Sequence, residues 1–261
     1  MFRSALLYFT ALHPFPATIQ IVLIPSIIAA GLTVIVRWLY GYQALSRNNT
    51  LAGIKFGIVG LTYVMLLTFA TISVWEKFSL AQTAVIDEAA AARAIYIIAK
   101  GDTKQQIAIT NAIKNYLDKA INQGWPLMAI EKDSPDTKSA LDDLYKSAVA
   151  YDDVGPQTTQ IASELFKHID RINDSMLVRT TLSKGIVPDL LWFILLFGAV
   201  LTIGFTLFFG GESIIVQAIM TVITSSIMLL ALLVIISFDH PFTGDVSVSS
   251  QPLEIALKDM K

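Results

Sequence analysis

Long apolar runs alternate with polar stretches along the chain, and four of these runs are long enough to cross a membrane. The four runs lie near residues 16–36, 51–75, 187–209 and 213–238. A helix needs about 20 consecutive apolar residues to span the hydrocarbon core of a bilayer. Aromatic side chains that favour the membrane–water interface stand near the ends of the runs, namely Trp38, Tyr40, Trp75 and Trp192. The pattern therefore predicts four transmembrane helices, with a kink at Pro25 and with Pro188 in a first helical turn.

The block between the second and third runs is polar and has the periodicity of helices. In residues 107–121 one face carries Ile109, Ile113, Tyr116 and Ala120. In residues 161–176 one face carries Ile161, Leu165, Ile169, Ile172 and Met176. Helix starts are predicted at Asp102 and Ser134-Pro135, and breaks at Pro126 and at 155–157. We expect the second and third membrane helices to continue into this block.

These elements predict an all-α polytopic membrane protein with four transmembrane helices and a helical extramembrane domain between helices 2 and 3. The expected N-terminal division, residues 1–75, contains helices 1 and 2, and the helical domain follows at residues 76–186. Helices 3 and 4 occupy residues 187–238, and the C-terminal tail is residues 239–261. Residues 1–16 contain one Arg and no clear cleavage site, so we interpret the first run as a retained membrane helix.

Composition supports a membrane protein and excludes several function classes. Of the 261 residues, 54% are hydrophobic and only 15% are charged, whereas soluble proteins average about 25% charged residues. The net charge of −2 disfavours nucleic-acid binding. The absence of Cys excludes disulfides and thiolate chemistry. The catalytic, phosphate-binding and calcium-loop motifs GxSxG, P-loop, HExxH and EF-hand are absent, and His13, His168 and His240 have no ligand spacing, so no enzyme, metal site or cofactor is predicted.

Charge in the short loop predicts the orientation of the helices. Residues 37–50 carry Arg37 and Arg47 and no acid, and Lys55 follows just inside the second run. The positive-inside rule places this loop in the cytoplasm. Both termini and the helical domain would then face the outer, periplasmic side of a bacterial plasma membrane.

Small and polar residues form stripes on three of the apolar runs. The stripes contain Gly53, Gly57, Gly60, Thr68, Thr71 and Trp75, then Gly198, Thr202 and Thr206, and finally Ser213, Gln217, Thr221 and Thr224. One interpretation is helix packing through small residues and hydroxyl groups. The other is a water-lined ion path, because hydroxyls from symmetry-related subunits can replace part of an ion's hydration shell. The candidate path-lining residues are Thr68, Thr71, Gln217, Thr221 and Thr224.

No Asp, Glu, Lys or Arg lies in the middle of any run. Proton pumps and coupled transporters usually keep an ionisable group at membrane depth. The sequence therefore argues against these two classes.

The stretch "SFDHPFTGDVSVS" (237–249) follows the last run and offers two acidic candidates for ion binding, Asp239 and Asp245. The alternative is local: Asp239 ends the membrane helix, Pro241 stops it, and the chain turns at 243–245. A short amphipathic helix then begins at "QPLEIALKDM", which would dock on the polar domain or on a neighbouring subunit. The acidic pairs Asp142-Asp143 and Asp152-Asp153 are interpreted as solvated helix faces.

Several segments together resemble the bacterial bestrophin-like membrane-protein family. They are Gly57, Gly60 and Tyr63, residues 74–91, residues 122–128, Arg171 and Arg179, residues 186–210, and residues 237–257. The likeness covers roughly residues 50–257, and the last stretch is its most specific part.

The resemblance implies an architecture and an activity. Bestrophins are pentameric anion channels with two spans, a helical polar region and two further spans. They keep the polar region in the cytoplasm, opposite to the orientation that the loop charges predict here. Their Pro-Phe-Gly-acidic stretch helps to bind calcium in calcium-gated members, and Pro241, Phe242, Gly244 and Asp245 match it in outline. Thr243 interrupts the match and "VSVSS" replaces the acidic run, so calcium gating is not expected.

The expected function is a passive ion channel formed by a homo-oligomer in the lipid bilayer. The resemblance to bestrophins implies that the permeant ions are anions and that the oligomer is a pentamer. The alternative is a non-conducting scaffold or accessory subunit that binds a protein partner through residues 102–180. A stator-like coupling subunit is a weaker alternative, because it needs a partner helix that carries the proton-binding acid.

Overall fold

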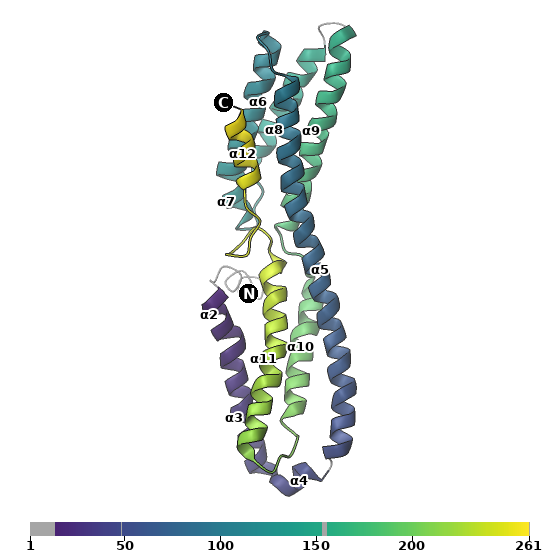
Figure 1. Cartoon of the computed structure of the whole chain (residues 1–261), viewed down its shortest axis with the longest axis vertical. Coiled ribbons are helices and arrows are strands. Elements are labelled where there is room, and N and C mark those ends of the chain that lie inside the picture. Colours follow the sequence, from purple (N-terminus) through teal and green to yellow (C-terminus); the bar gives the residue numbers. More distant parts are fainter. Residues whose placement is uncertain (1–13, 48, 153–155, 261) are drawn as a thin grey trace. The chain divides into compact units, whose positions relative to one another are not determined.

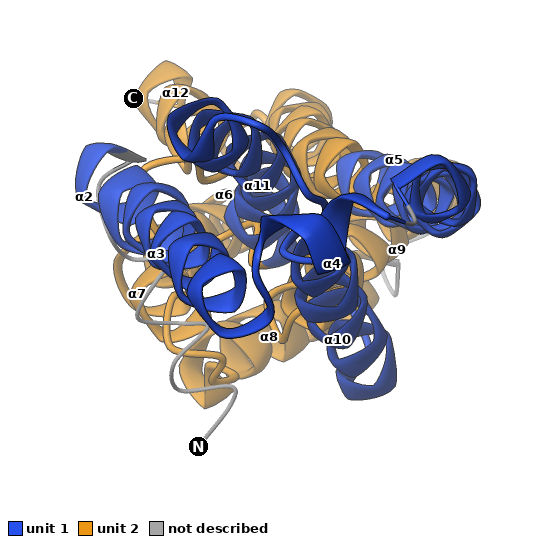
Figure 2. Cartoon of the chain, turned by 90° about the horizontal axis from the view of Figure 1, so that it is seen from below, with its two compact units in different colours: residues 1–76, 187–239 blue, residues 77–186, 240–261 orange. Residues whose placement is uncertain are grey.

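The computed structural model describes residues 14–47, 49–152 and 156–260, and these residues form helices and turns without a strand (Figure 1). Two compact units are present (Figure 2). The first comprises residues 1–76 and 187–239, and the second comprises residues 77–186 and 240–261. The predicted all-α fold is confirmed.

The first unit contains the apolar helices. They are α2 (Pro14–Thr18), η1 (Ile19–Leu23), α3 (Ile24–Tyr40), α4 (Tyr42–Ser46), the first part of α5 (Asn49–Ile98), α10 (Asp189–Thr206) and α11 (Ile214–Asp239). Four stretches of the described chain are long and apolar enough to span a membrane: Phe15–Tyr40, Asn49–Ile98, Asp189–Thr206 and Ile214–Asp239. By length and composition, the four predicted membrane helices are confirmed.

Helix α11 packs along α3 and also contacts η1 and α10. Two hydroxyl pairs bridge the seam between α3 and α11, Ser226 to Ser26 at 3.0 Å and Thr33 to Thr221 at 3.2 Å. On α5, the buried Tyr63 hydroxyl donates to the carbonyl of Leu195 in α10 at 2.9 Å. Hydroxyl bonds between helices replace the hydrophobic driving force that is missing in lipid, so these contacts hold the spans together.

Two prolines lie within continuous helix, each separated by one residue from a preceding π-helical turn. Pro25 follows η1, where the N–H of Ile24 donates to the carbonyl of Ile19. Pro126 follows η2 (Ala120–Gly124) in the same way and lies in α7 (Trp125–Met128). The wider turn accommodates a ring that would clash in a regular α-helix. The break predicted at Pro126 is therefore wrong, because the π turn carries the helix past it.

The second unit is a bundle of amphipathic helices. It contains the second part of α5, α6 (Lys104–Lys119), η2, α7, α8 (Pro135–Asp152), α9 (Pro156–Leu182) and α12 (Gln251–Asp259). The faces predicted for α6 and α9 form its core, and only Ile161, 38% exposed, lies at the edge. Helix α8 begins at Pro135 as predicted. Helix α6 begins after Thr103 rather than at Asp102, because Thr103 and Gln106 form a capping box.

The connections to the membrane helices differ from the prediction in one respect. Helix α5 runs through both units without interruption, as expected for the second span. The third span does not continue into the domain, since α9 ends at Leu182 and α10 begins at Asp189 with Pro188 as its N-cap rather than in its first turn. The C-terminal tail belongs to the second unit, where α12 packs against α6 of the same chain.

Candidate functional site

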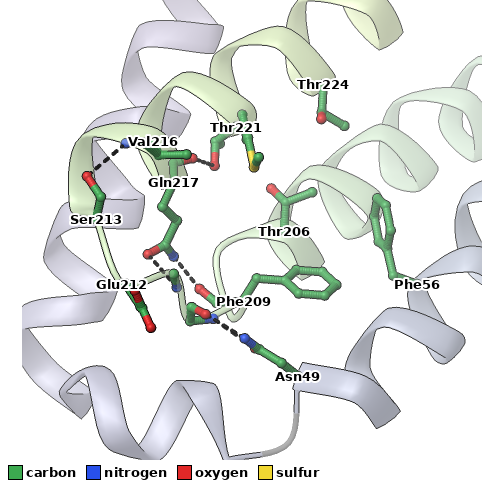
Figure 3. A pocket seen from close by; sticks show the side chains of 13 residues that line it. Asn49, Phe56, Thr206, Phe209, Glu212, Ser213, Val216, Gln217, Thr221 and Thr224 are labelled. Carbon is green, nitrogen blue, oxygen red and sulfur yellow. Dashed lines mark hydrogen bonds between the residues drawn. The ribbon is translucent and has the colours of Figure 1, made fainter.

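The first unit contains a cavity of about 550 Å³ beside the turn that joins α10 to α11 (Figure 3). Phe56, Phe209 and Met220 form apolar parts of its wall. Three of the residues predicted to line an ion path, Gln217, Thr221 and Thr224, border this cavity, whereas Thr68 and Thr71 do not. The structure thus separates the five sequence candidates into two groups.

Three side chains hold the turn at residues 209–212; we call Arg37, Asn49 and Gln217 the turn clamp. The Gln217 amide donates to the Phe209 carbonyl and accepts from the Gly211 N–H. The Asn49 amide bonds to both the carbonyl and the N–H of Gly210. Figure 3 shows Asn49 and Gln217 reaching this turn from different helices. Both the nitrogen and the oxygen of the Gln217 amide, a predicted path-lining group, therefore have hydrogen-bond partners within the same chain.

Arg37 completes the clamp from α3. Its guanidinium donates to the Gly211 carbonyl at 2.7 Å and to the Glu212 carbonyl at 2.9 Å. The 37–50 loop and the 207–213 turn consequently lie at the same end of the first unit. Glu212 lies at this end together with Arg37 and Arg47, and its negative charge reduces the net positive charge there. The orientation in the membrane stays a prediction.

The remaining α11 candidates differ in burial. Thr221 is buried, and its hydroxyl donates to the Gln217 carbonyl at 3.1 Å and accepts from Thr33. Thr224 is half-buried at the cavity wall. Thr221 is thus part of the helix seam, and Thr224 is the α11 threonine that faces open space.

The α5 candidates lie on a more open surface. Thr68 is exposed and its hydroxyl donates to the Val64 carbonyl at 2.8 Å, while the half-buried Thr71 donates to Leu67 at the same distance. On the same stripe, a Cβ added to Gly53 or Gly57 would meet no other atom within 4 Å. Packing within the described chain therefore does not explain these small residues.

The two acidic candidates are not equivalent. The buried Asp239 carboxylate accepts from the Val187 N–H at 2.7 Å and from the Trp192 indole N–H at 3.3 Å, so it fixes the start of α10. Asp245 is exposed in a turn of the second unit. Among the described residues, no group of three or more His, Cys, Asp or Glu is placed to hold a metal ion. Ion binding by Asp239 and Asp245 stays a prediction.

Replacing Asp239 by Ala is expected to lower the free energy of unfolding by about 1–3 kcal/mol, because the buried Val187 N–H loses its acceptor. Thermal unfolding in detergent measures the loss. The same assay with added calcium tests ion binding, since a ligand that binds only the folded state raises its stability. A calcium-dependent rise that disappears in Asp239→Ala would contradict the purely structural role.

Residues 23–253 match the Bestrophin-like domain. The chain belongs to the bestrophin-like family. Among curated proteins, none matches the chain.

Solved structures agree with this bestrophin-like fold. A bacterial bestrophin homologue from Klebsiella pneumoniae is 14% identical, with 91% of this chain and 98% of that chain covered and a TM-score of 0.71. A point mutant of the Klebsiella homologue is 15% identical over 93% and 98% of the two chains, with a TM-score of 0.72. A further crystal structure, described as a membrane protein, is 13% identical over 91% and 97%, with a TM-score of 0.73. At these identities the likeness shows the fold alone.

A buried ionic cluster in the second unit was not predicted as a site. Arg179 donates to both oxygens of Glu88, at 2.7 and 3.0 Å, and the Tyr116 hydroxyl donates to Glu88 at 2.6 Å. The side chains of Arg179 and Glu88 are 1% and 0% exposed. Trp125 covers the guanidinium, 5.2 Å from the ring centroid. Charged residues in the middle of apolar helical faces, such as Glu88 between Ala84 and Ala92, were the available signal.

The electrostatics of this cluster keep Arg179 charged and Tyr116 neutral. Burial alone would lower the pKa of Arg179, but the Glu88 carboxylate raises it above its usual value. Burial, and then the charge of Glu88, raise the pKa of the Tyr116 hydroxyl well above its ordinary value. The Arg179 guanidinium is therefore charged and the Tyr116 phenol neutral at physiological pH.

Proposed function

We propose that this bestrophin-like chain assembles into a homo-oligomeric channel through which small ions cross a bacterial plasma membrane passively, with anions as the expected permeant ions. Family membership supports the channel class. The observation that carries the proposal is the open face of α5, where Gly53 and Gly57 have free space beside them and Thr68 is exposed. A small and polar face in an apolar helix needs a polar or closely packed neighbour, which symmetry-related copies and an ion path would supply.

The two groups of candidate residues have different roles in this proposal. Thr68 and Thr71 are proposed to line the path, because rings of hydroxyls contributed by several subunits can solvate an ion without fixed charge. Gln217 and Thr221 are proposed to keep the α10–α11 turn and the α3–α11 seam in place. Thr224, at the cavity wall, is the α11 residue that would contact ions if the path extends there.

The composition of the spans supports passive conduction. No acidic or basic side chain lies in the middle of a span, where proton pumps and coupled transporters usually keep an ionisable group. Selectivity would then arise from pore width, from hydroxyl groups and from charges at the ends of the path.

Ion flux into liposomes tests the proposal, with chloride, potassium and gluconate gradients across vesicles that contain the purified protein. Thr68→Val and Thr71→Val are expected to lower flux about fivefold or to change ion preference, because each removes a hydroxyl contact of about 1 kcal/mol. Gln217→Leu and Thr221→Val are expected to lower thermal stability while leaving ion preference unchanged.

The control is Thr62→Val, since Thr62 is exposed on α5 and lies off the stripe, with its hydroxyl bonded to Ile58 of its own helix. Tight vesicles containing folded oligomer would reject conduction. They would favour the scaffold alternative, for which the exposed apolar side chains of Ile107 and Val149 in residues 102–180 offer partner contacts.

A further inference from the structure

One loop of the second unit contacts both segments through which the chain enters and leaves the last two spans. This loop, residues 129–133, follows α7 and precedes α8. Its Asp133 pairs with Lys184 at 3.2 Å, in the segment that leads to α10. Its Glu131 pairs with the Nε2 atom of His240 at 2.9 Å, in the segment that leaves α11. Each connecting segment is thus held by one acid–base contact.

The His240 contact is tightly enclosed. The His240 side chain is 5% exposed, and a Cβ on Gly185 would lie 3.1 Å from its Nε2 atom. Glu131 has a φ of 58°, an uncommon left-handed conformation for a non-glycine residue, so its surroundings must hold it there. Next to His240, Thr243 donates to the Ala129 carbonyl at 3.1 Å. The contact is therefore built into the packing of the loop against residues 240–243.

Several other charged groups lie on the segments around His240. They are Lys132 and Asp133 of the loop, Lys184 of the segment before α10, Asp239 at the end of α11, and Asp245 of the following turn. Lys184 and then Lys138 hold the pKa of Asp133 below its usual value, so Asp133 stays a carboxylate at neutral pH. Imidazoles are the side chains that ordinarily change charge between pH 5 and 8. A pH response between pH 5 and 8 therefore points to the contact that contains an imidazole, the one between His240 and Glu131.

We propose that His240 and Glu131 form a proton-operated latch on the segment that leaves α11. With a protonated imidazole the contact joins two opposite charges, whereas a neutral imidazole can only donate its N–H to the carboxylate, so the contact weakens when the proton is lost. The latch holds residues 240–243 against the loop more firmly at pH 6 than at pH 8. A second step rests on the proposed channel function: we infer that ion flux depends on pH through His240.

Amide hydrogen exchange of the full chain in detergent tests the latch at pH 6 and pH 8, after correction for intrinsic exchange rates. Protection of peptides covering residues 239–248 is expected to be roughly fivefold higher at pH 6, as a difference of about 1 kcal/mol implies. His240→Gln, whose amide can still donate to Glu131, should lose this pH difference, and so should Glu131→Gln. His168→Gln is the matched control and should keep it, because His168 lies elsewhere, on α9.

Equal protection at both pH values in the unchanged protein would overturn the latch. The same pH response in His240→Gln and Glu131→Gln would also overturn it. Liposome flux separates the latch from the channel. Flux that is identical at pH 6 and pH 8 overturns the regulatory step, whereas absence of flux at any pH with a normal exchange difference rejects the channel and supports the latch. If His240→Gln does not fold, Glu131→Gln alone decides the result.

Discussion

Replacing Glu88 by Ala is expected to lower the free energy of unfolding by about 3–5 kcal/mol, because Arg179 would remain charged and buried without its carboxylate. The Tyr116 hydroxyl would lose its acceptor in the same variant. Denaturant or thermal unfolding of the purified protein in detergent measures the loss. The effect should reach the whole second unit, because the cluster joins α5, α6 and α9.

Asp87→Asn is the matched control, since Asp87 is the neighbour of Glu88 and pairs with Arg171 at 2.9 Å on the surface. An exposed pair of this kind contributes at most about 1 kcal/mol. A double variant, Glu88→Leu with Arg179→Met, should be less destabilised than Glu88→Ala, because no buried charge remains unpaired. If Glu88→Ala unfolds at the same temperature or denaturant concentration as Asp87→Asn, the assigned role of the cluster is contradicted.

Gly210→Ala is expected to destabilise the first unit by about 1–3 kcal/mol through overpacking. The added Cβ would lie 2.5 Å from the backbone nitrogen of Ser46 and 2.7 Å from the carbonyl carbon of Leu45. Backbone atoms cannot rotate away as a side chain can, so the turn must move and loosen its bonds to Asn49 and Arg37. Thermal unfolding and the yield of folded protein in detergent report the change.

Gly204→Ala serves as the comparison, because a Cβ at Gly204 in α10 would meet nothing within 4 Å of the described chain. This variant should unfold within about 1 kcal/mol of the unchanged protein, the range set by helix propensity. Similar losses in both variants would show that the close approach of Gly210 to Ser46 is not what constrains the turn.

Hydropathy and helical periodicity were sufficient to predict the spans and the core faces of the second unit. Apolar positions such as Ile113, Leu165 and Ile169 are buried because a helix must place its apolar stripe inward. The errors concern local backbone geometry. The sequence contains Pro126 but no sign of the π turn before it, and the interruption between α9 and α10 was missed although Gly185, with a φ of 86°, and Pro188 mark it, whereas α5 contains no proline.

The candidate site was harder to predict, because the helical spacing of polar residues does not show which group each side chain bonds to. Gln217 lies on a polar face with helical spacing, yet it bonds to Phe209 and Gly211 in the preceding turn. Asn49 and Arg37 gave no periodic signal, and Arg37 was interpreted only as a marker of orientation. Hydrogen bonds between segments distant in sequence, such as Arg37 with Gly211, depend on the three-dimensional arrangement.

The length of the uninterrupted α5 helix has a consequence for its backbone. Its 50 residues rise about 1.5 Å each and give a helix about 75 Å long, of which a bilayer core covers about 30 Å. About 45 Å of the same helix therefore lies outside the hydrocarbon core. Because the backbone N–H groups of a helix interior bond to carbonyls of the same helix, the chain crosses the membrane–water boundary within α5 without leaving a backbone group unpaired there.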